Sequence, residues 1–110
     1  MNSPSLTQRE LDLIASVLRR HPEVKKATLF GSRAKGTHRS YSDVDIAVKG
    51  VVSSLGAEAI AAELDELPLP YRFEVQSFDQ INHQPLREHI QRVGLEIYRL
   101  TPEQPVEVSK

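Results

Sequence analysis

Residues 43–48 form a stretch in which carboxylates alternate with branched apolar side chains, a pattern that few structures accommodate. Successive side chains of a β-strand point to opposite faces of the sheet, so a strand here places Asp43 and Asp45 on one face. The opposite, apolar face is expected to consist of Val44, Ile46 and Val48. Two carboxylates roughly 5 Å apart repel each other by about 3 kcal/mol at an effective dielectric constant of about 20. A protein relieves this repulsion either by keeping one carboxyl protonated, with a raised pKa, or by binding a cation.

Segments with helical and strand-like patterns alternate along the rest of the chain. A first helix is expected after Thr7, where Glu10 completes a capping box, and it stops before Pro22. Further helices are expected at residues 54–67 and 85–93, and strands at residues 26–30, 43–48, 72–78 and 95–100. The apolar stripe of the second helix is expected to be Leu55, Ala59, Ile60 and Leu64, and the C-terminal cap of the third is expected to be Gly94. This alternation predicts an α/β or α+β fold, in which helices pack on a sheet of about four strands.

The composition is that of a globular protein and excludes several classes of function. With 110 residues, the chain is expected to form one domain at residues 1–100 and a flexible tail at residues 101–110. The net charge of −1 argues against a stand-alone nucleic-acid-binding protein. The absence of cysteine excludes disulfides and thiolate metal sites. No apolar run approaches the roughly 20 residues of a membrane span, and no signal peptide is evident, so a cytoplasmic location is expected.

A turn suited to phosphate binding precedes the acidic strand. Gly31 and Ser32 end one predicted strand and open a short helical turn, where unpaired backbone N–H groups attract anions. Gly31 lets a phosphate approach the backbone closely, the Ser32 hydroxyl adds a donor, and Arg33 adds positive charge. The sequence therefore predicts a phosphate-binding turn directly before the strand of Asp43 and Asp45.

Glu74 is the candidate for a third carboxylate. It alternates with apolar residues on the predicted strand at residues 72–78, so it lies beside Asp43 and Asp45 if that strand neighbours theirs. There it would serve as a metal ligand or as a general base. Carboxylates together with substrate phosphates are the ligands that Mg²⁺ takes in proteins. A phosphate-binding turn beside a metal-binding strand is the minimum equipment for phosphoryl or nucleotidyl transfer.

The spacing between the two motifs is the most specific signal in the chain. Gly-Ser followed after ten residues by Asp-x-Asp is expected by chance in only about one or two chains per thousand of this length. The same spacing is the signature of the DNA polymerase β-like nucleotidyltransferases, which the chain resembles over nearly its whole length. More narrowly, it resembles the minimal, MntA-type nucleotidyltransferases of prokaryotes in the segments LFGSRAKG, YSDVDIAV, RFEVQSF and LREHIQRVGLEIY. In that family the third acidic residue is usually aspartate, whereas Glu74 stands at that position here.

The resemblance implies a fold, a reaction and a partner. The fold is a small mixed sheet with helices on one side, like the palm of polymerase β. The reaction transfers a nucleoside monophosphate from a nucleoside triphosphate and releases pyrophosphate. By position, the triphosphate would be held by Gly31 and Ser32, with Arg33 nearby, and Mg²⁺, as two ions with bound nucleotide, by the catalytic carboxylates Asp43, Asp45 and Glu74. Because minimal members pair with HEPN-domain proteins in toxin–antitoxin modules, the expected reaction moves AMP from ATP to a tyrosine of a HEPN toxin.

Plainer interpretations of the same residues stay open. Asp43 and Asp45 can be a turn residue and a solvated strand residue, and Glu74 a surface residue. The chain can also act as a binding module that neutralises a HEPN partner by complex formation, or, less favoured, modify a small molecule such as an aminoglycoside. The polar side chains of the last predicted helix form either an exposed face or part of a partner interface: Arg87, Glu88, Gln91 and Arg92.

Overall fold

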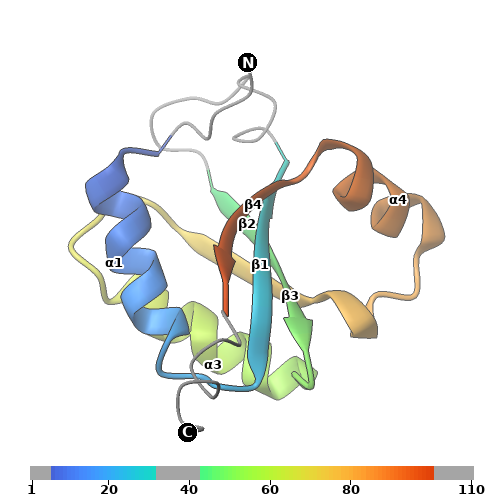
Figure 1. Ribbon diagram of the computed structural model, residues 1–110, viewed down its shortest axis with the longest axis horizontal. Coiled ribbons are helices and arrows are strands. Elements are labelled where there is room, and N and C mark those ends of the chain that lie inside the picture. The colour runs from blue at the N-terminus through green and yellow to red at the C-terminus, as the bar shows by residue number, and fades with distance from the viewer. Residues whose placement is uncertain (1–5, 32–42, 101–110) are drawn as a thin grey trace, which may run out of the picture.

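The described chain, residues 6–31 and 43–100 of a computed structural model, contains four strands and the helices that pack on them (Figure 1). In chain order these elements are α1 (Gln8–Leu18), β1 (Val24–Phe30), β2 (Val44–Gly50), α3 (Ser54–Asp65), β3 (Phe73–Ser77), the short 3-10 helix η1 (Phe78–Gln80), α4 (Gln84–Val93) and β4 (Leu95–Arg99). Each long helix and each strand that the sequence predicts is present, with ends that shift by a few residues. The predicted tail at residues 101–110 and the turn after Gly31 lie outside the described residues.

The strands form one mixed sheet in the order β3-β2-β1-β4. β1 is antiparallel to both of its neighbours, β2 and β4, whereas β2 and β3 are parallel. A parallel pair needs a crossover connection, and α3 supplies it between β2 and β3. The α+β fold class and the small mixed sheet are confirmed, and β3 does neighbour β2, which was the condition for placing Glu74 beside the aspartates.

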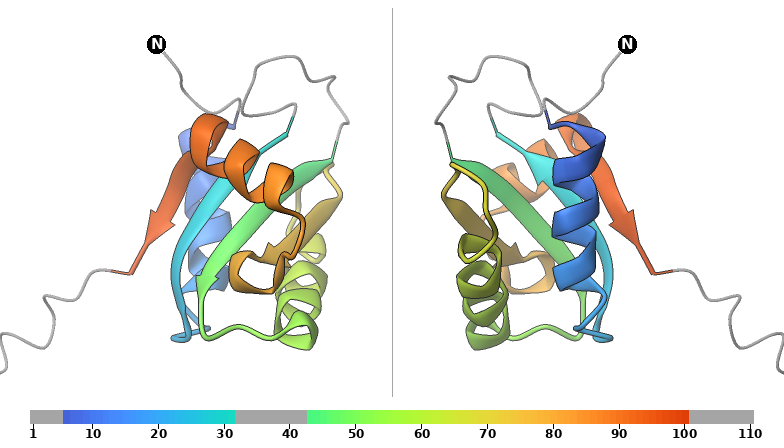
Figure 2. Two further views of the ribbon diagram at one scale, coloured as in Figure 1. Left: turned by 90° about the vertical axis from the view of Figure 1, so that its right-hand side faces the viewer. Right: turned by 90° about the vertical axis from the view of Figure 1, so that its left-hand side faces the viewer.

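One face of the sheet is covered by α1 and α3, which lie on the same side (Figure 2). The predicted alternation of β2 is confirmed, because its fully buried side chains in this layer are Val44, Ile46 and Val48. The capping box of α1 is confirmed as well: the Glu10 amide donates to the Thr7 hydroxyl over 3.1 Å, and the Thr7 amide donates to Glu10 Oε1 over 3.0 Å. The apolar face of β2 therefore leaves its acidic residues on the opposite side of the sheet.

The opposite face is partly covered by α4 and η1 (Figure 2). A second apolar cluster forms there, in which Ile90 of α4 and Phe78 of η1 pack with Phe30 and Ala47 of the sheet. The expectation of helices on one side only is therefore wrong. Phe30 and Ala47 make this part of the second face apolar, and burial removes that surface from water.

The predicted apolar stripe of α3 is only partly correct. Ile60 and Leu64 are buried as expected, but Leu55 is 75% exposed and Ala59 is also exposed, whereas Ala57 is buried. At about 100° per residue, Leu55 lies roughly 140° around the helix from Ile60, and Ala57 only about 60°. Burial thus follows the angular position of each residue, and the small side chain of Ala57 belongs to the stripe in place of Leu55.

Gly94 occupies the C-terminal cap of α4, as predicted, but for a different reason. Its backbone is extended, with φ −69° and ψ 150°, so the left-handed conformation that favours glycine is not used. A Cβ atom at this position would collide with the Thr28 methyl group and the Ile90 carbonyl oxygen. Glycine is required here because α4 turns into β4 directly against β1.

Candidate active site

Backbone pairing brings the predicted carboxylates to one edge of the sheet. Asp45 is the partner of Glu74 in the parallel register of β2 and β3. It is also the partner of Phe30 in the antiparallel register of β1 and β2. Neighbouring strands lie about 4.8 Å apart, so paired side chains on one face are close. Asp43 directly precedes β2 and is exposed, and it is near enough to Asp45 to act on its charge.

Gly31 follows β1 and packs against the Asp45 carboxylate. Its φ of +81° lies in the left-handed region that side chains rarely adopt. A Cβ atom built at this position would lie 2.5 Å from Asp45 Oδ2, which is inside van der Waals contact. Glycine therefore allows both the turn of the backbone and the close approach of the carboxylate, so the turn after β1 and the acidic start of β2 meet.

The electrostatics of this edge favour a positive ligand. The pKa of the half-buried Asp45 carboxyl is raised above its usual value of 3.8, first by burial and then by the negative charges of Glu74 and Asp43. The fold therefore keeps the carboxyl groups of Asp43, Asp45 and Glu74 close together although they repel each other, as expected for aspartates on one strand face. A cation bound between these carboxylates would stabilise their charged forms.

The described side chains alone do not form a complete metal site. Within residues 6–31 and 43–100, no group of three or more His, Cys, Asp or Glu side chains is arranged to hold a metal ion. Carboxylate oxygens at the edge nevertheless suit Mg²⁺, which commonly takes one or two carboxylates and completes its shell with water and substrate phosphate. Ser32 and Arg33 lie outside the described residues, so their contact with phosphate stays a prediction.

Arg87 is a residue whose role the sequence pattern did not reveal. It was expected on an exposed or partner-binding face, yet its guanidinium donates to the carbonyl oxygens of Phe78 over 2.8 Å and Ile81 over 3.1 Å. It also lies 4.3 Å from the centre of the Phe78 ring. Arg87 therefore fixes η1, the turn that follows β3, onto α4. The sequence pattern did not predict this role, because Arg87 follows the residues whose carbonyl oxygens it binds by nine and six positions, a spacing that matches neither a helix nor a strand.

The polymerase beta nucleotidyltransferase family matches residues 12–103, a region that includes the four strands and the acidic edge. The chain belongs to this family. This match confirms the family that was inferred from the Gly-Ser and Asp-x-Asp spacing. The carboxylates of this nucleotidyltransferase lie on its four-stranded sheet. No curated protein sequence matches the chain.

Solved toxin–antitoxin complexes contain chains with the same fold as this nucleotidyltransferase. A chain of an MntA–HepT complex is 19% identical with a TM-score of 0.66, and the alignment covers 93% of this chain and 79% of that one. A chain of a toxin–antitoxin complex with AMP-PNP is 20% identical with a TM-score of 0.68, covering 87% and 78%. A chain of the tri-AMPylated Shewanella oneidensis HEPN toxin in complex with MNT antitoxin is 19% identical with a TM-score of 0.67, covering 94% and 79%.

The described helices of the present protein include none that is long and apolar enough to cross a membrane.

Proposed function

We propose that this nucleotidyltransferase moves AMP from ATP to a tyrosine hydroxyl of a HEPN-domain toxin, with Mg²⁺ as cofactor, and so acts as an antitoxin. The observation that carries the proposal is the meeting of Asp45, Glu74 and the Gly31 turn at one edge of a nucleotidyltransferase sheet. The partner is supported by the similar folds in complexes of MntA with HepT and of an AMPylated HEPN toxin with its antitoxin. The nucleotide is supported by the similar fold in a complex with AMP-PNP.

Each residue of the edge has a role in this reaction. Asp43 and Asp45 would hold Mg²⁺, which neutralises charge on the phosphate oxygens when it is bound. Gly31, Ser32 and Arg33 would bind the triphosphate, as the sequence predicts. The acceptor oxygen attacks the α-phosphorus, and the bond from that phosphorus to the pyrophosphate oxygen breaks. Glu74 accepts the proton of the acceptor hydroxyl or serves as a third metal ligand.

Transfer of label from α-³²P ATP to the purified HEPN partner tests the proposal. With Mg²⁺ we expect labelling by the wild type and by a control, Glu58→Ala/Glu66→Ala, which removes two exposed carboxylates from the α3 region. We expect at least a hundredfold slower labelling by Asp43→Ala/Asp45→Ala, because removing groups that act on developing charge costs about that much. Labelling by this double variant at the wild-type rate would refute the catalytic role of the edge.

Glu74 favours a second candidate, a binding module that neutralises its partner without catalysis. The side chain is exposed and one methylene longer than the aspartate usual in the resembled family, which changes the reach of the third carboxylate. In a growth assay with the toxin, the enzyme proposal expects Asp43→Ala/Asp45→Ala to lose protection. Protection by that variant, together with an intact complex on gel filtration, would favour the binding module.

A further inference from the structure

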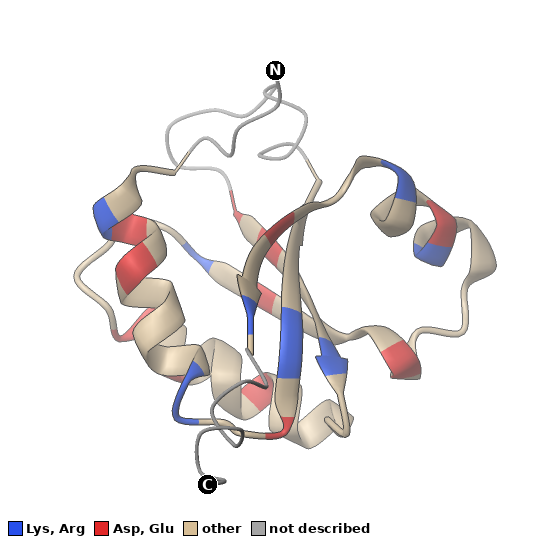
Figure 3. Cartoon of the chain, in the orientation of Figure 1, with Lys and Arg blue, Asp and Glu red and all other residues tan. Residues whose placement is uncertain are grey.

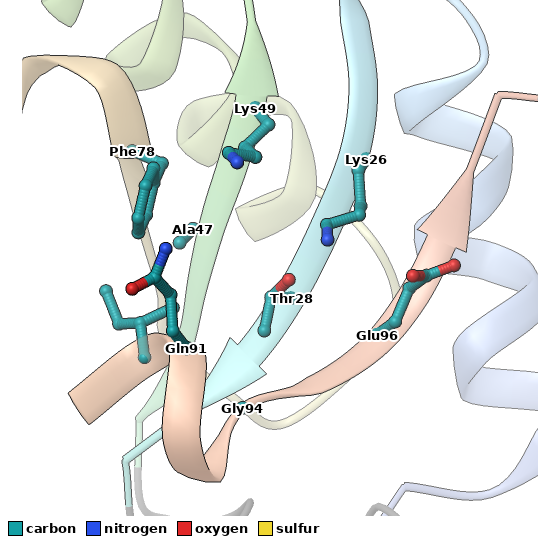
Figure 4. A pocket seen from close by; sticks show the side chains of 9 residues that line it. Lys26, Thr28, Ala47, Lys49, Phe78, Gln91, Gly94 and Glu96 are labelled. Carbon is teal, nitrogen blue, oxygen red and sulfur yellow. The ribbon is translucent and has the colours of Figure 1, made fainter. Parts of the chain in front are cut away.

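A cavity of about 290 Å³ lies on the same face of the sheet as the acidic edge, and its lining begins at Ala47, two residues after Asp45 on β2. Its walls come from β1, β2, β4, η1 and the C-terminal end of α4 (Figure 4). Lys49 lines it four residues after Asp45 on the same strand, which corresponds to roughly 13 Å along β2. Acidic residues mark the beginning of β2 and a basic residue its end (Figure 3). The cavity and the acidic edge are thus two sites of opposite charge.

Lys26 and Lys49 lie side by side on the strands that form the floor of this cavity. They are direct partners in the antiparallel register of β1 and β2, and both side chains extend into the space between the strands and α4 (Figure 4). Like charges directly opposite each other on neighbouring strands destabilise a sheet. The arrangement therefore carries a cost in the empty protein that a bound anion would remove.

The carboxylate in the cavity does not neutralise both lysines. Glu96 accepts two hydrogen bonds from the Arg99 guanidinium, of 2.8 and 2.7 Å, which already balance its charge. Lys26 is close enough to contribute to the lowered pKa of Glu96, after the dominant effect of Arg99. Lys49 lies 4.9 Å from the centre of the Phe78 ring, an interaction that leaves its charge in place. The lining therefore keeps an excess of positive charge.

Neutral donors complete the lining. The Thr28 hydroxyl and the Gln91 carboxamide both face the cavity, between and beside the two lysines (Figure 4). The cavity is open to solvent on one side and, at about 290 Å³, is larger than one phosphate ion requires. A single phosphate ion underfills that space, whereas a diphosphate group fits it in size and in charge.

We propose that this cavity is a second ligand site, which binds a diphosphate group between Lys26 and Lys49. Two ammonium groups complement the two phosphoryl units, and Thr28 and Gln91 donate to the remaining oxygens. The ligand is free pyrophosphate or a nucleoside diphosphate, which share this chemistry. The site is independent of the transfer reaction proposed above, so it can be tested without ATP, magnesium or a partner.

The test is the thermal unfolding midpoint of the full chain with sodium pyrophosphate, in EDTA and at constant ionic strength. Saturating pyrophosphate is expected to raise the midpoint of the wild type by about 4 °C or more. Lys26→Gln/Lys49→Gln is expected to lose that rise and, without the anion, to unfold at a midpoint near that of the wild type, because removal of the like-charge pair offsets the lost contact of Lys49 with the Phe78 ring. The control Lys25→Gln/Arg92→Gln removes the same charge from exposed positions of β1 and α4 and is expected to keep the rise.

Three outcomes would overturn the proposal. The first is no rise in the wild type, and the second is an equal rise in Lys26→Gln/Lys49→Gln. The third is an equal rise with malonate, which would assign the cavity to carboxylates, such as acidic side chains of a partner. A larger rise with ADP than with pyrophosphate at equal concentration supports the nucleoside diphosphate as the ligand, and the reverse order supports free pyrophosphate.

Amide chemical shifts of the wild type locate the ligand without any variant. Pyrophosphate in EDTA is expected to shift the amide signals of Thr28, Ala47 and Gln91, which line the cavity. Shifts confined to Gly31 and Asp45 would place the anion at the acidic edge and contradict the assignment.

Discussion

Replacing Gly31 with alanine tests whether the Asp45 carboxylate packs against the turn after β1. The left-handed φ of +81° costs a non-glycine residue about 1–2 kcal/mol, whatever surrounds it. The added Cβ would also lie 2.5 Å from Asp45 Oδ2, so the carboxylate must rotate away, and overpacking of this kind costs about 1–2 kcal/mol more. We expect Gly31→Ala to lower the free energy of unfolding by about 2–4 kcal/mol.

A double-mutant cycle separates the two contributions. In an Asp45→Ala background the contact is absent, so Gly31→Ala is expected to cost only the backbone term of about 1–2 kcal/mol. Urea unfolding followed by circular dichroism measures all four proteins, and equal m-values would show that the same surface is exposed in each. If Gly31→Ala costs the same in both backgrounds to within about 0.5 kcal/mol, the carboxylate does not lie against this turn.

Three further changes test separate features of the structure. Asp45→Asn is expected to raise the free energy of unfolding at pH 7 without Mg²⁺. Burial and the charges of Glu74 and Asp43 raise the pKa of Asp45 in the folded state, so the wild type loses stability as pH rises through that pKa. Urea titrations across pH should show the difference vanish below the usual value of 3.8. Arg87→Ala is expected to lower the free energy of unfolding in urea by about 2–3 kcal/mol, because two carbonyl oxygens lose a charged donor. Arg87→Lys should recover only part of this stability, and an unchanged unfolding midpoint of Arg87→Ala would contradict the anchoring role. Thr7→Ala is expected to lower stability by about 1 kcal/mol through loss of the helix cap, which a matched Gln8→Ala control should not reproduce.

The sequence predicted those features that depend on neighbours in the chain. The alternation of residues 43–48 determines which side chains share a face, so the burial of Val44 and the placement of Asp45 opposite it are confirmed. The capping box at Thr7 needs only two residues three positions apart, and it is confirmed too.

Features that depend on distant parts of the chain were harder to predict. The face of the sheet that α4 covers is decided by Phe30 and Ala47, far from α4 in the sequence. The pairing of Asp45 with Glu74 was conditional on strand order, which no local pattern gives. The neighbouring lysines of β1 and β2 were missed for the same reason, because only the strand register places Lys26 beside Lys49.

The parallel pairing of β2 with β3 also sets when the acidic edge assembles as the chain folds. Parallel strands cannot pair through a tight hairpin, so we expect β3 to join β2 late in folding, together with the docking of α3. Asp45 and Glu74 are then expected to meet after the transition state, which has already buried much of the apolar surface. Their mutual repulsion then speeds unfolding more than it slows folding. In stopped-flow experiments, Glu74→Gln should therefore lower the unfolding rate constant and leave the folding rate constant nearly unchanged. The carboxylates to which we assign a role in transfer would thereby shorten the lifetime of the unliganded fold.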